Sequence, residues 1–406
     1  MRKASERCGR RLIVRVLRGA ASRMLLYTDH MFMTTRPGMV LGAVGLALVV
    51  AAGTPKAQRR QVGTEPWDGP DAAPWLTADA AASGLDPAKL DRAARLAETT
   101  HADSLVVVHH GRIVFERHWN DRGPDDVQQM YSATKSPFAL LVGRVLARGD
   151  ISSLDQPLVD FVPELAGQGR AALTFRNAMA MESGLAQSPE LDQGDIRAGR
   201  SQLEATLARG TTHGPYEYFI YNHAGYRILF TALERATGMS LPDLTREELF
   251  APLGMTGAYW VEIRNDDRLL GYQSIRMRPR DLAKVGQLML NDGLWNGSRY
   301  LSAEYIEQLR TAPAPKANPS YGLFWHLNAG DFYLSYRESN FMRSRLLPGT
   351  PPDAYANFGN SGQIVVVVPS LDLVWVRTGR QIPSNIWTPN STVAQLSAAV
   401  VAAAGR

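Results

Sequence analysis

The pattern of hydrophobic and polar residues becomes regular at Asp86, where the first predicted element is a helix that runs to about Thr100. Asp86 suits the N-cap, because its side chain can accept hydrogen bonds from the first turn, and Pro87 suits the first helical position. The next apolar stretch, Ser104 to Trp119, is rich in β-branched residues and is divided by Gly111. This pattern predicts two antiparallel strands joined by a turn at Gly111.

A second hairpin is predicted near the other end of the chain. Gln363 to Arg377 holds two apolar runs separated by turn residues at 369–372, and Asn390 to Ala404 predicts a final helix. The pattern between the hairpins is mostly helical. We therefore expect an α+β fold in which strands from both termini form one antiparallel sheet flanked by helices. An all-helical lobe, about residues 150–310, would be inserted within a domain that spans residues 86–406.

The N-terminus has the charge pattern of an export signal. Residues 1–38 contain nine Lys or Arg and two acidic residues, and residues 39–52 carry no charge. That apolar stretch is too short to span a bilayer comfortably but suits the core of a signal peptide. We expect residues 1–57 to be a basic leader and signal peptide, cleaved or retained as an anchor, and residues 58–85 to be a linker. The protein would be periplasmic or secreted, with transient membrane contact through the leader only.

Composition narrows the expected chemistry. The net charge of +5 is smaller than the N-terminal excess, so the rest of the chain is slightly acidic and we expect no nucleic-acid surface. The single cysteine, Cys8, precedes the apolar stretch, so the mature protein would have no thiol and no disulfide. His109, His110 and His326 suit structural or surface positions rather than a metal site. We expect neither a metal nor another cofactor.

Ser132 and Lys135 form a Ser-x-x-Lys motif at the start of a predicted buried helix, Ala133 to Arg148. A serine hydroxyl becomes an effective nucleophile when a base takes its proton, and residues three apart at a helix start share one face. Burial and the positive end of the helix dipole both disfavour a charged lysine, which lets its amine act as that base. The alternative is that Ser132 is only an N-cap, so the surrounding sequence must decide.

The segments around and after Ser132 resemble those of the β-lactamase-related serine hydrolases, in the order that the family has them. This family includes class C β-lactamases, D-alanyl-D-alanine carboxypeptidases, esterases and 6-aminohexanoate-dimer hydrolases. The resemblance implies an acyl-enzyme mechanism and a β-lactamase/DD-peptidase-like fold, which agrees with the fold predicted above. It covers about residues 86–404 and rests on Tyr131-Ser-Ala-Thr-Lys-Ser136, Gly149-Asp-Ile-Ser-Ser-Leu-Asp155, Leu173-Thr-Phe-Arg-Asn177, Glu182-Ser-Gly-Leu185, Tyr221-Asn-His-Ala-Gly-Tyr226, Pro252-Leu-Gly-Met255, Arg278-Pro-Arg-Asp281, Asn296-Gly-Ser-Arg-Tyr-Leu301 and Gly362-Gln363.

The second motif of the family, Tyr-x-Asn, falls on Tyr221-Asn222-His223 when it is aligned on the Ala-Gly-Tyr that follows. The resemblance implies that Tyr221 carries protons between serine, lysine and leaving group; the alternative is a tyrosine packed in an aromatic cluster. His223 replaces the usual asparagine. We expect it to orient the lysine or bind substrate by donating a hydrogen bond, and it can also titrate. The alternative is a histidine that only packs beneath the lobe.

The third family motif, Lys-Thr-Gly, is missing, because its position falls near Ala354-Tyr-Ala356. The chain therefore lacks the lysine of this motif, which binds a substrate carboxylate in the family. We still expect substrate binding at Asn357 and Gly359, where the strand backbone would supply the second oxyanion N–H. Arg377-Thr-Gly379 looks like the motif but would lie far from the serine. This form resembles esterases and 6-aminohexanoate-dimer hydrolases more than β-lactamases.

The sequence therefore predicts an exported serine hydrolase that cleaves an amide or ester bond of a small molecule. Ser132, Lys135 and Tyr221 are its expected catalytic residues. The alternative enzyme is a β-lactamase or a D-Ala-D-Ala carboxypeptidase. The alternative of another class is a catalytically inactive relative that binds a ligand or peptidoglycan.

Overall fold

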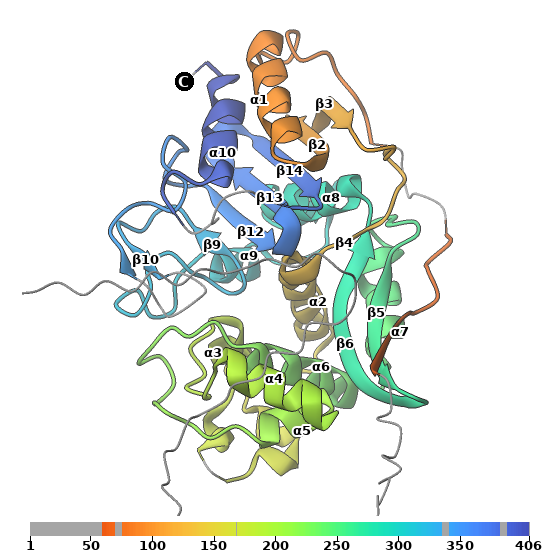
Figure 1. The fold of residues 1–406 in the computed structure, drawn as a ribbon, viewed down its shortest axis with the longest axis vertical. Coiled ribbons are helices and arrows are strands. Elements are labelled where there is room, and N and C mark those ends of the chain that lie inside the picture. Colours follow the sequence, from red (N-terminus) through yellow and green to blue (C-terminus); the bar gives the residue numbers. More distant parts are fainter. Residues whose placement is uncertain (1–58, 70–74, 168, 335–340, 382–387, 406) are drawn as a thin grey trace, which may run out of the picture. The chain divides into compact units, whose positions relative to one another are not determined.

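The computed structural model describes residues 59–69, 75–167, 169–334, 341–381 and 388–405, and Figure 1 shows how they fold. The predicted leader and signal peptide, residues 1–57, lie outside the described residues. Within these described ranges, no helix is both long enough and apolar enough to cross a membrane.

The centre of the fold is a six-stranded antiparallel sheet built from both ends of the chain, which confirms the predicted fold class. Its strand order is β3-β2-β14-β13-β12-β9. Both predicted hairpins form, β2 with β3 and β13 with β14, and β14 pairs with β2 to join the two ends. The strands are β2 (Ala102–His109), β3 (Arg112–His118), β9 (His326–Leu327), β12 (Tyr355–Gly359), β13 (Gln363–Val368) and β14 (Leu373–Gly379).

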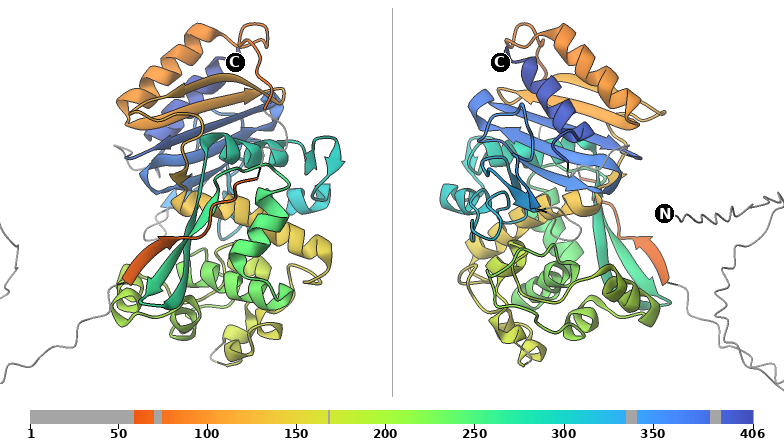
Figure 2. Two further views of the ribbon diagram at one scale, coloured as in Figure 1. Left: turned by 90° about the vertical axis from the view of Figure 1, so that its right-hand side faces the viewer. Right: turned by 60° about the vertical axis from the view of Figure 1, so that its left-hand side comes forward.

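Helices cover both faces of this sheet (Figure 2). Val107 and Trp375 pack with α1 and α10 on one face, whereas Val106 and Val376 belong to the core shared with α2 and α8 on the other. Because both faces are buried, the strands read in the sequence as continuous apolar runs rather than as an alternation. The helices are α1 (Pro87–Thr99), α2 (Lys135–Arg148), α8 (Pro279–Leu290) and α10 (Thr392–Ala402).

The middle of the chain forms a second lobe that is not all-helical, so this detail of the prediction is wrong. A long hairpin, β5 (Tyr259–Asn265) and β6 (Arg268–Met277), joins two short strands in a sheet of order β1-β5-β6-β4. The sequence signal for this hairpin was the aromatic and β-branched residues on either side of a turn at Asp266, which has a φ of +50°. Charged residues interleaved along both strands made this strand pattern hard to recognise. The short strands are β1 (Arg59–Gly63) and β4 (Gln128–Gln129).

Strand β1 lies within the stretch predicted to be a linker, where its backbone pairs with β5 at the edge of the sheet. The remaining elements are short apart from one helix, α6, whose N-terminus points to the candidate site. They are α3 (Phe175–Met179), α4 (Pro189–Ala198), α5 (Gln202–Leu207), α6 (His223–Thr237), α7 (Leu241–Thr245), α9 (Ala303–Leu309), β7 (Leu294–Trp295), β8 (Ser298–Arg299), β10 (Tyr333–Leu334) and β11 (Phe341–Met342).

A glycine lets α8 lie close against the main sheet. A Cβ atom added to Gly286 would lie 2.6 Å from Val374 Cγ1 and 3.0 Å from Val365 Cγ2. Both neighbours are buried valines on central strands, so neither has room to move aside.

We expect Gly286→Ala to destabilise the protein by about 1 kcal/mol or more, because overpacking outweighs the gain in helix propensity. Gly194 of α4 is the matched control, since an added Cβ there would meet nothing within 4 Å. Gly194→Ala should stabilise the protein by about 0.5–1 kcal/mol. Urea unfolding measures both changes, and equal effects of the two substitutions would contradict the close packing of α8.

The second lobe buries a carboxyl group that has no cation beside it in the structure as described. The Glu182 side chain is 1% exposed, and its Oε2 atom has no hydrogen-bond partner. Burial raises the pKa of Glu182 from its ordinary value of 4.5 to about 8. The folded state therefore favours the protonated acid. Because ionisation of the buried carboxyl group is unfavourable, the free energy of unfolding falls as the pH rises from 4.5 to about 8.

We expect Glu182→Gln to stabilise the protein more at pH 8 than at pH 5. The amide resembles the protonated acid and cannot ionise, so the difference between variant and wild type should grow by roughly 3 kcal/mol, at about 1.4 kcal/mol per pKa unit. Unfolding by urea at the two pH values measures this difference. A difference that is the same at both pH values would show that Glu182 does not titrate in this window.

Candidate active site

Ser132 lies in a short turn that is held from two sides. The turn is a 3-10 helix, η1 (Tyr131–Thr134), which leads directly into α2. On one side, Met130 N–H donates to Ile275 O of β6 at 2.9 Å, and Ile275 N–H donates to Thr134 Oγ1 at 3.0 Å. On the other side, Gly359 of β12 is so close that an added Cβ would overlap Met130 O. The turn is thus fixed between the two sheets.

The backbone of this turn places Ser132 and Lys135 on one side. In 3-10 geometry the side chains at positions i and i+3 eclipse each other, and Lys135 N–H donates to the carbonyl oxygens of Ser132 and Ala133. Tyr131 has a φ of +47°, a left-handed conformation that costs a non-glycine residue about 1–3 kcal/mol and that concentrates at functional turns. The N-cap positions are Met130 and Thr134, so Ser132 is not the N-cap.

The amine of Lys135 is buried between two tyrosine rings. Its side chain is 2% exposed, and Nζ lies 4.3 Å from the ring centre of Tyr226 and 4.8 Å from that of Tyr221. Burial holds the pKa of Lys135 well below its usual range, and the charge of Arg227 lowers it further. The lysine therefore favours the neutral amine, the form that can accept a proton.

The N-terminus of α6 brings Tyr221 and His223 to the same place. Asn222, between them, is the N-cap: its Oδ1 accepts from Gly225 N–H at 2.8 Å and its Nδ2 donates to Leu185 O at 2.8 Å. The rings of Tyr221 and His223 meet edge-to-face with centroids 5.8 Å apart. Burial lowers the pKa of His223, and the charge of Lys135 is one of the smaller causes. Lys135, Tyr221 and His223 thus form one cluster.

The β12 side of the site consists mainly of backbone. A Cβ on Gly359 would lie 2.9 Å from Ala133 N, so this glycine touches the Ser132 turn directly. Asn357 is 3% exposed, and its Nδ2 donates to Phe324 O at 2.6 Å, which ties its side chain to the neighbouring segment. Only the backbone of Asn357 is therefore placed to meet a substrate. Strand β9 pairs with Tyr355 and Ala356, so Asn357 lies just beyond that pairing.

Arg377, which resembles the missing lysine in sequence, has a structural role. It lies on β14, two strands away from β12, and its side chain is fully buried. Its guanidinium donates to the carbonyl oxygens of Gly362, Thr100 and Gln381.

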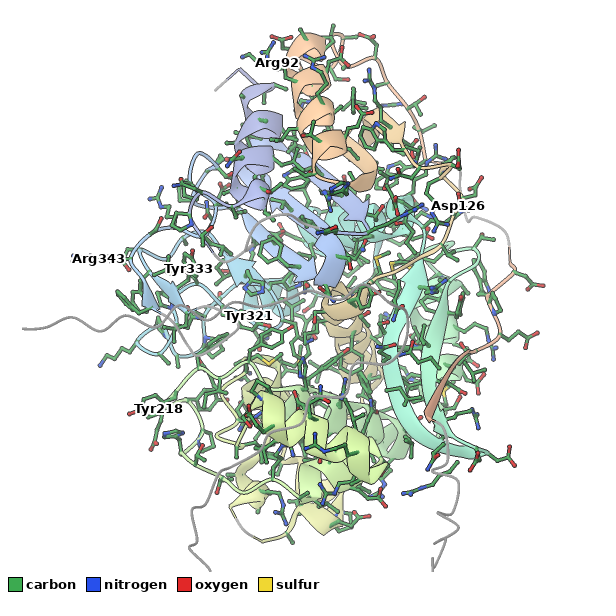
Figure 3. All side chains as sticks on the ribbon, viewed as in Figure 1. Arg92, Asp126, Tyr218, Tyr321, Tyr333 and Arg343 are labelled. Carbon is green, nitrogen blue, oxygen red and sulfur yellow. The ribbon has the colours of Figure 1, made fainter. Side chains whose placement is uncertain are left out.

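Several residues around Lys135 had no assigned role in the sequence analysis. Tyr226 stood in a quoted motif, but nothing in the sequence distinguished it from a packed aromatic residue. His326 was expected to be structural, and its ring does pack on Phe358 and Tyr321, with Tyr321 lying between sheet and lobe (Figure 3). Burial lowers the pKa of His326 to about 3, with a contribution from Lys135. His326 is therefore a neutral neighbour of the lysine.

Asp192 of α4 also had no signal in the sequence, because a single acid in an exposed helix is common. Its Oδ2 atom lies 2.9 Å from His223 Nδ1. In the described part of the chain, no group of three or more His, Cys, Asp or Glu residues could hold a metal ion. The cluster offers a hydroxyl, a neutral amine, a phenol and an imidazole, which together suit proton transfer to and from an acyl centre.

Comparison with known proteins finds relatives that are hydrolases by name. The chain is 24% identical over 295 residues to a 6-aminohexanoate-dimer hydrolase of Paenarthrobacter ureafaciens, covering 69% of this chain and 73% of that protein. It is 28% identical over 218 residues to a D-aminopeptidase of Cereibacter sphaeroides, covering 50% of this chain and 40% of that one.

Solved structures share the fold. A candidate 6-aminohexanoate-dimer hydrolase from Bacillus anthracis superimposes with a TM-score of 0.64 at 19% identity, covering 84% of this chain and 90% of that one. A class C β-lactamase from Rhodobacter sphaeroides does so with a TM-score of 0.53 at 16% identity, covering 78% and 99%. The model of the Beta-lactamase family matches residues 90–386, which is most of the chain. The chain therefore belongs to the Beta-lactamase family of serine hydrolases.

Proposed function

We propose that this protein hydrolyses an amide or ester bond through an acyl-enzyme on Ser132. The observation that carries the proposal is the state of Lys135. Its amine is buried against the rings of Tyr221 and Tyr226, its pKa is lowered by burial, and it lies three residues from Ser132 in a turn that aligns the two. Few structural roles require a lysine to be kept neutral at such a cost in desolvation.

In the proposed reaction, Ser132 loses a proton when the acyl-enzyme forms and regains one when the acyl-enzyme is hydrolysed. Ser132 Oγ attacks the substrate carbonyl while its proton passes to Lys135 Nζ, and Tyr221 relays that proton to the leaving group as the bond to it breaks. The oxyanion would be held by backbone N–H groups at Ser132 and at the Asn357–Gly359 stretch of β12. Water then attacks the acyl group and the serine recovers its proton.

The residues at the start of β12 limit the substrates that we propose. At the position of the family's Lys-Thr-Gly motif the chain has Ala354, Tyr355 and Ala356, so no side chain there provides a cation to bind a carboxylate. We propose a small-molecule amide or ester without that carboxylate, rather than a β-lactam or a D-Ala-D-Ala peptide. Relatives named as a 6-aminohexanoate-dimer hydrolase and as an esterase/β-lactamase support an amide or an ester as the bond that is cleaved.

We also propose export to the periplasm or beyond, on the charge pattern of residues 1–52 alone.

The rival function is that of an inactive relative that only binds its ligand. It would have no reason to keep a neutral lysine beside the serine, and the following experiment separates the two.

We expect the protein to form one covalent adduct with a fluorophosphonate, on Ser132, and to hydrolyse p-nitrophenyl esters or linear amides faster than a chromogenic cephalosporin. Ser132→Ala should abolish labelling and reduce turnover by on the order of 10⁴-fold or more. Ser136→Ala is the matched control, since that serine lies four residues further along, in the first turn of α2, and donates to Ala133 O at 2.8 Å. Peptide mapping locates the adduct. Absence of labelling in the wild type would favour the binding protein.

We expect kcat/KM to rise with pH through a limb that reports the deprotonation of Lys135, at a pH well below 10.5 because burial lowers this pKa. Lys135→Met should remove this limb from any residual activity and should fold at least as stably as the wild type, because it no longer buries an amine. Lys89→Met, on α1 at the far face of the sheet, should keep the limb. An unchanged limb in Lys135→Met would exclude this lysine as the base.

A further inference from the structure

The carboxylate of Asp192 is held rigidly by three donors. Arg209 Nη2 donates to Oδ1 at 3.1 Å, and Gln187 Nε2 donates to Oδ2 at 2.8 Å. His223 Nδ1 is the third partner, 2.9 Å from Oδ2. The side chain of Arg209 is 2% exposed, so this part of the network lies inside the lobe.

This arrangement decides which nitrogen of His223 carries the proton. Asp192 beside Arg209 is a carboxylate that only accepts hydrogen bonds, so the hydrogen of the contact must lie on His223 Nδ1. In the neutral imidazole Nε2 is then an acceptor. The expectation from sequence was a histidine that donates into the site; the Asp192 contact reverses this for the neutral ring.

The charges that face His223 come from three helices. Burial is the largest cause that lowers its pKa, the charges of Arg227 of α6 and Lys135 of α2 lower it further, and Asp192 of α4 raises it. Tyr221, in the loop before α6, contributes the edge-to-face ring contact. The imidazole is therefore neutral at neutral pH, and its protonation in acid would add a cation beside Lys135.

We propose that Asp192 is a positioning residue that fixes His223 as the Nδ1–H tautomer, so that Nε2 keeps its lone pair within the cluster of His223, Tyr221 and Lys135. This inference rests on the proposed function. When the proton of Ser132 Oγ moves to Lys135 Nζ, the buried amine becomes an ammonium. A neighbouring acceptor stabilises that ammonium, whereas an N–H in the same place would repel it. The carboxylate behind the ring strengthens the acceptor, as in other carboxylate–histidine pairs.

Asp192→Asn tests this directly. Arg209 can only donate, so the new amide should turn its oxygen to Arg209 and its NH₂ group toward His223 Nδ1 and Gln187. The amide of Gln187 can turn to accept, whereas His223 must move its proton to Nε2 to do so. The matched control is Asp195→Asn. Asp195 lies on the same helix, and its Oδ2 also accepts from Arg209, at 2.5 Å, but its Oδ1 accepts from Arg200, at 3.0 Å.

The tautomer is read from long-range ¹H–¹⁵N spectra of the full chain labelled with ¹⁵N-histidine, with the His223 signals assigned by their loss in His223→Asn. We expect the Nδ1–H tautomer in the wild type and in Asp195→Asn, and the Nε2–H tautomer in Asp192→Asn. With the ester or amide that the enzyme turns over best, kcat/KM should fall about 10- to 100-fold in Asp192→Asn, and the acidic limb of its pH profile should shift. For Asp195→Asn, kcat/KM should stay within about twofold of the wild type, and the acidic limb should not shift.

An Nε2–H tautomer in the wild type would overturn the inference without any variant, and so the test survives if Asp192→Asn fails to fold. An unchanged tautomer in Asp192→Asn, or an equal loss of activity in Asp195→Asn, would also overturn it. Failure of the proposed function is separate: it would appear as absence of the Ser132 adduct, whereas the tautomer is measured without turnover.

Discussion

A lysine amine serves as a base only where its charged form is unstable, and most of the structure around α2 depends on that constraint. Lys135 is buried against the rings of Tyr221 and Tyr226, and the ring of Tyr226 in turn packs on Phe138, Phe230 and Phe324. These aromatic residues come from the main helix, the lobe and the segment before β9. The two lobes must therefore both be folded, and packed against each other, before the lysine loses its proton.

The sequence predicted the elements that are local and apolar. Both hairpins of the main sheet, α1 with its Asp86 cap and α10 form where the pattern placed them, because caps, turns and continuous apolar runs are short-range signals. The hairpin β5–β6 was missed because charged residues are interleaved with its apolar ones. Strand β1 was missed because its polar residues are ordered by backbone pairing with a strand about 200 positions away.

The candidate site divides in the same manner. Ser132, Lys135 and Tyr221 stand in motifs, so their neighbourhood could be predicted, and His223 could be predicted as a substitution within a motif. Asp192, Arg227 and His326 could not, since each lies near the other site residues only once the chain has folded. The hydrogen bond from the Asn357 side chain to Phe324 O could not be predicted either, because it joins two segments that only the fold brings together. Motifs thus specify the reacting groups, and tertiary contacts set their charges and orientations.

The attachment of the Ser132 turn to two sheets has a mechanical consequence. Thr134 and Met130 bind Ile275 of β6, while Gly359 of β12 presses on the opposite side of the same turn. A hinge that opened the two sheets would have to break this joint and would carry the serine away from one of its walls. The two sheets are therefore expected to behave as one rigid frame during the reaction.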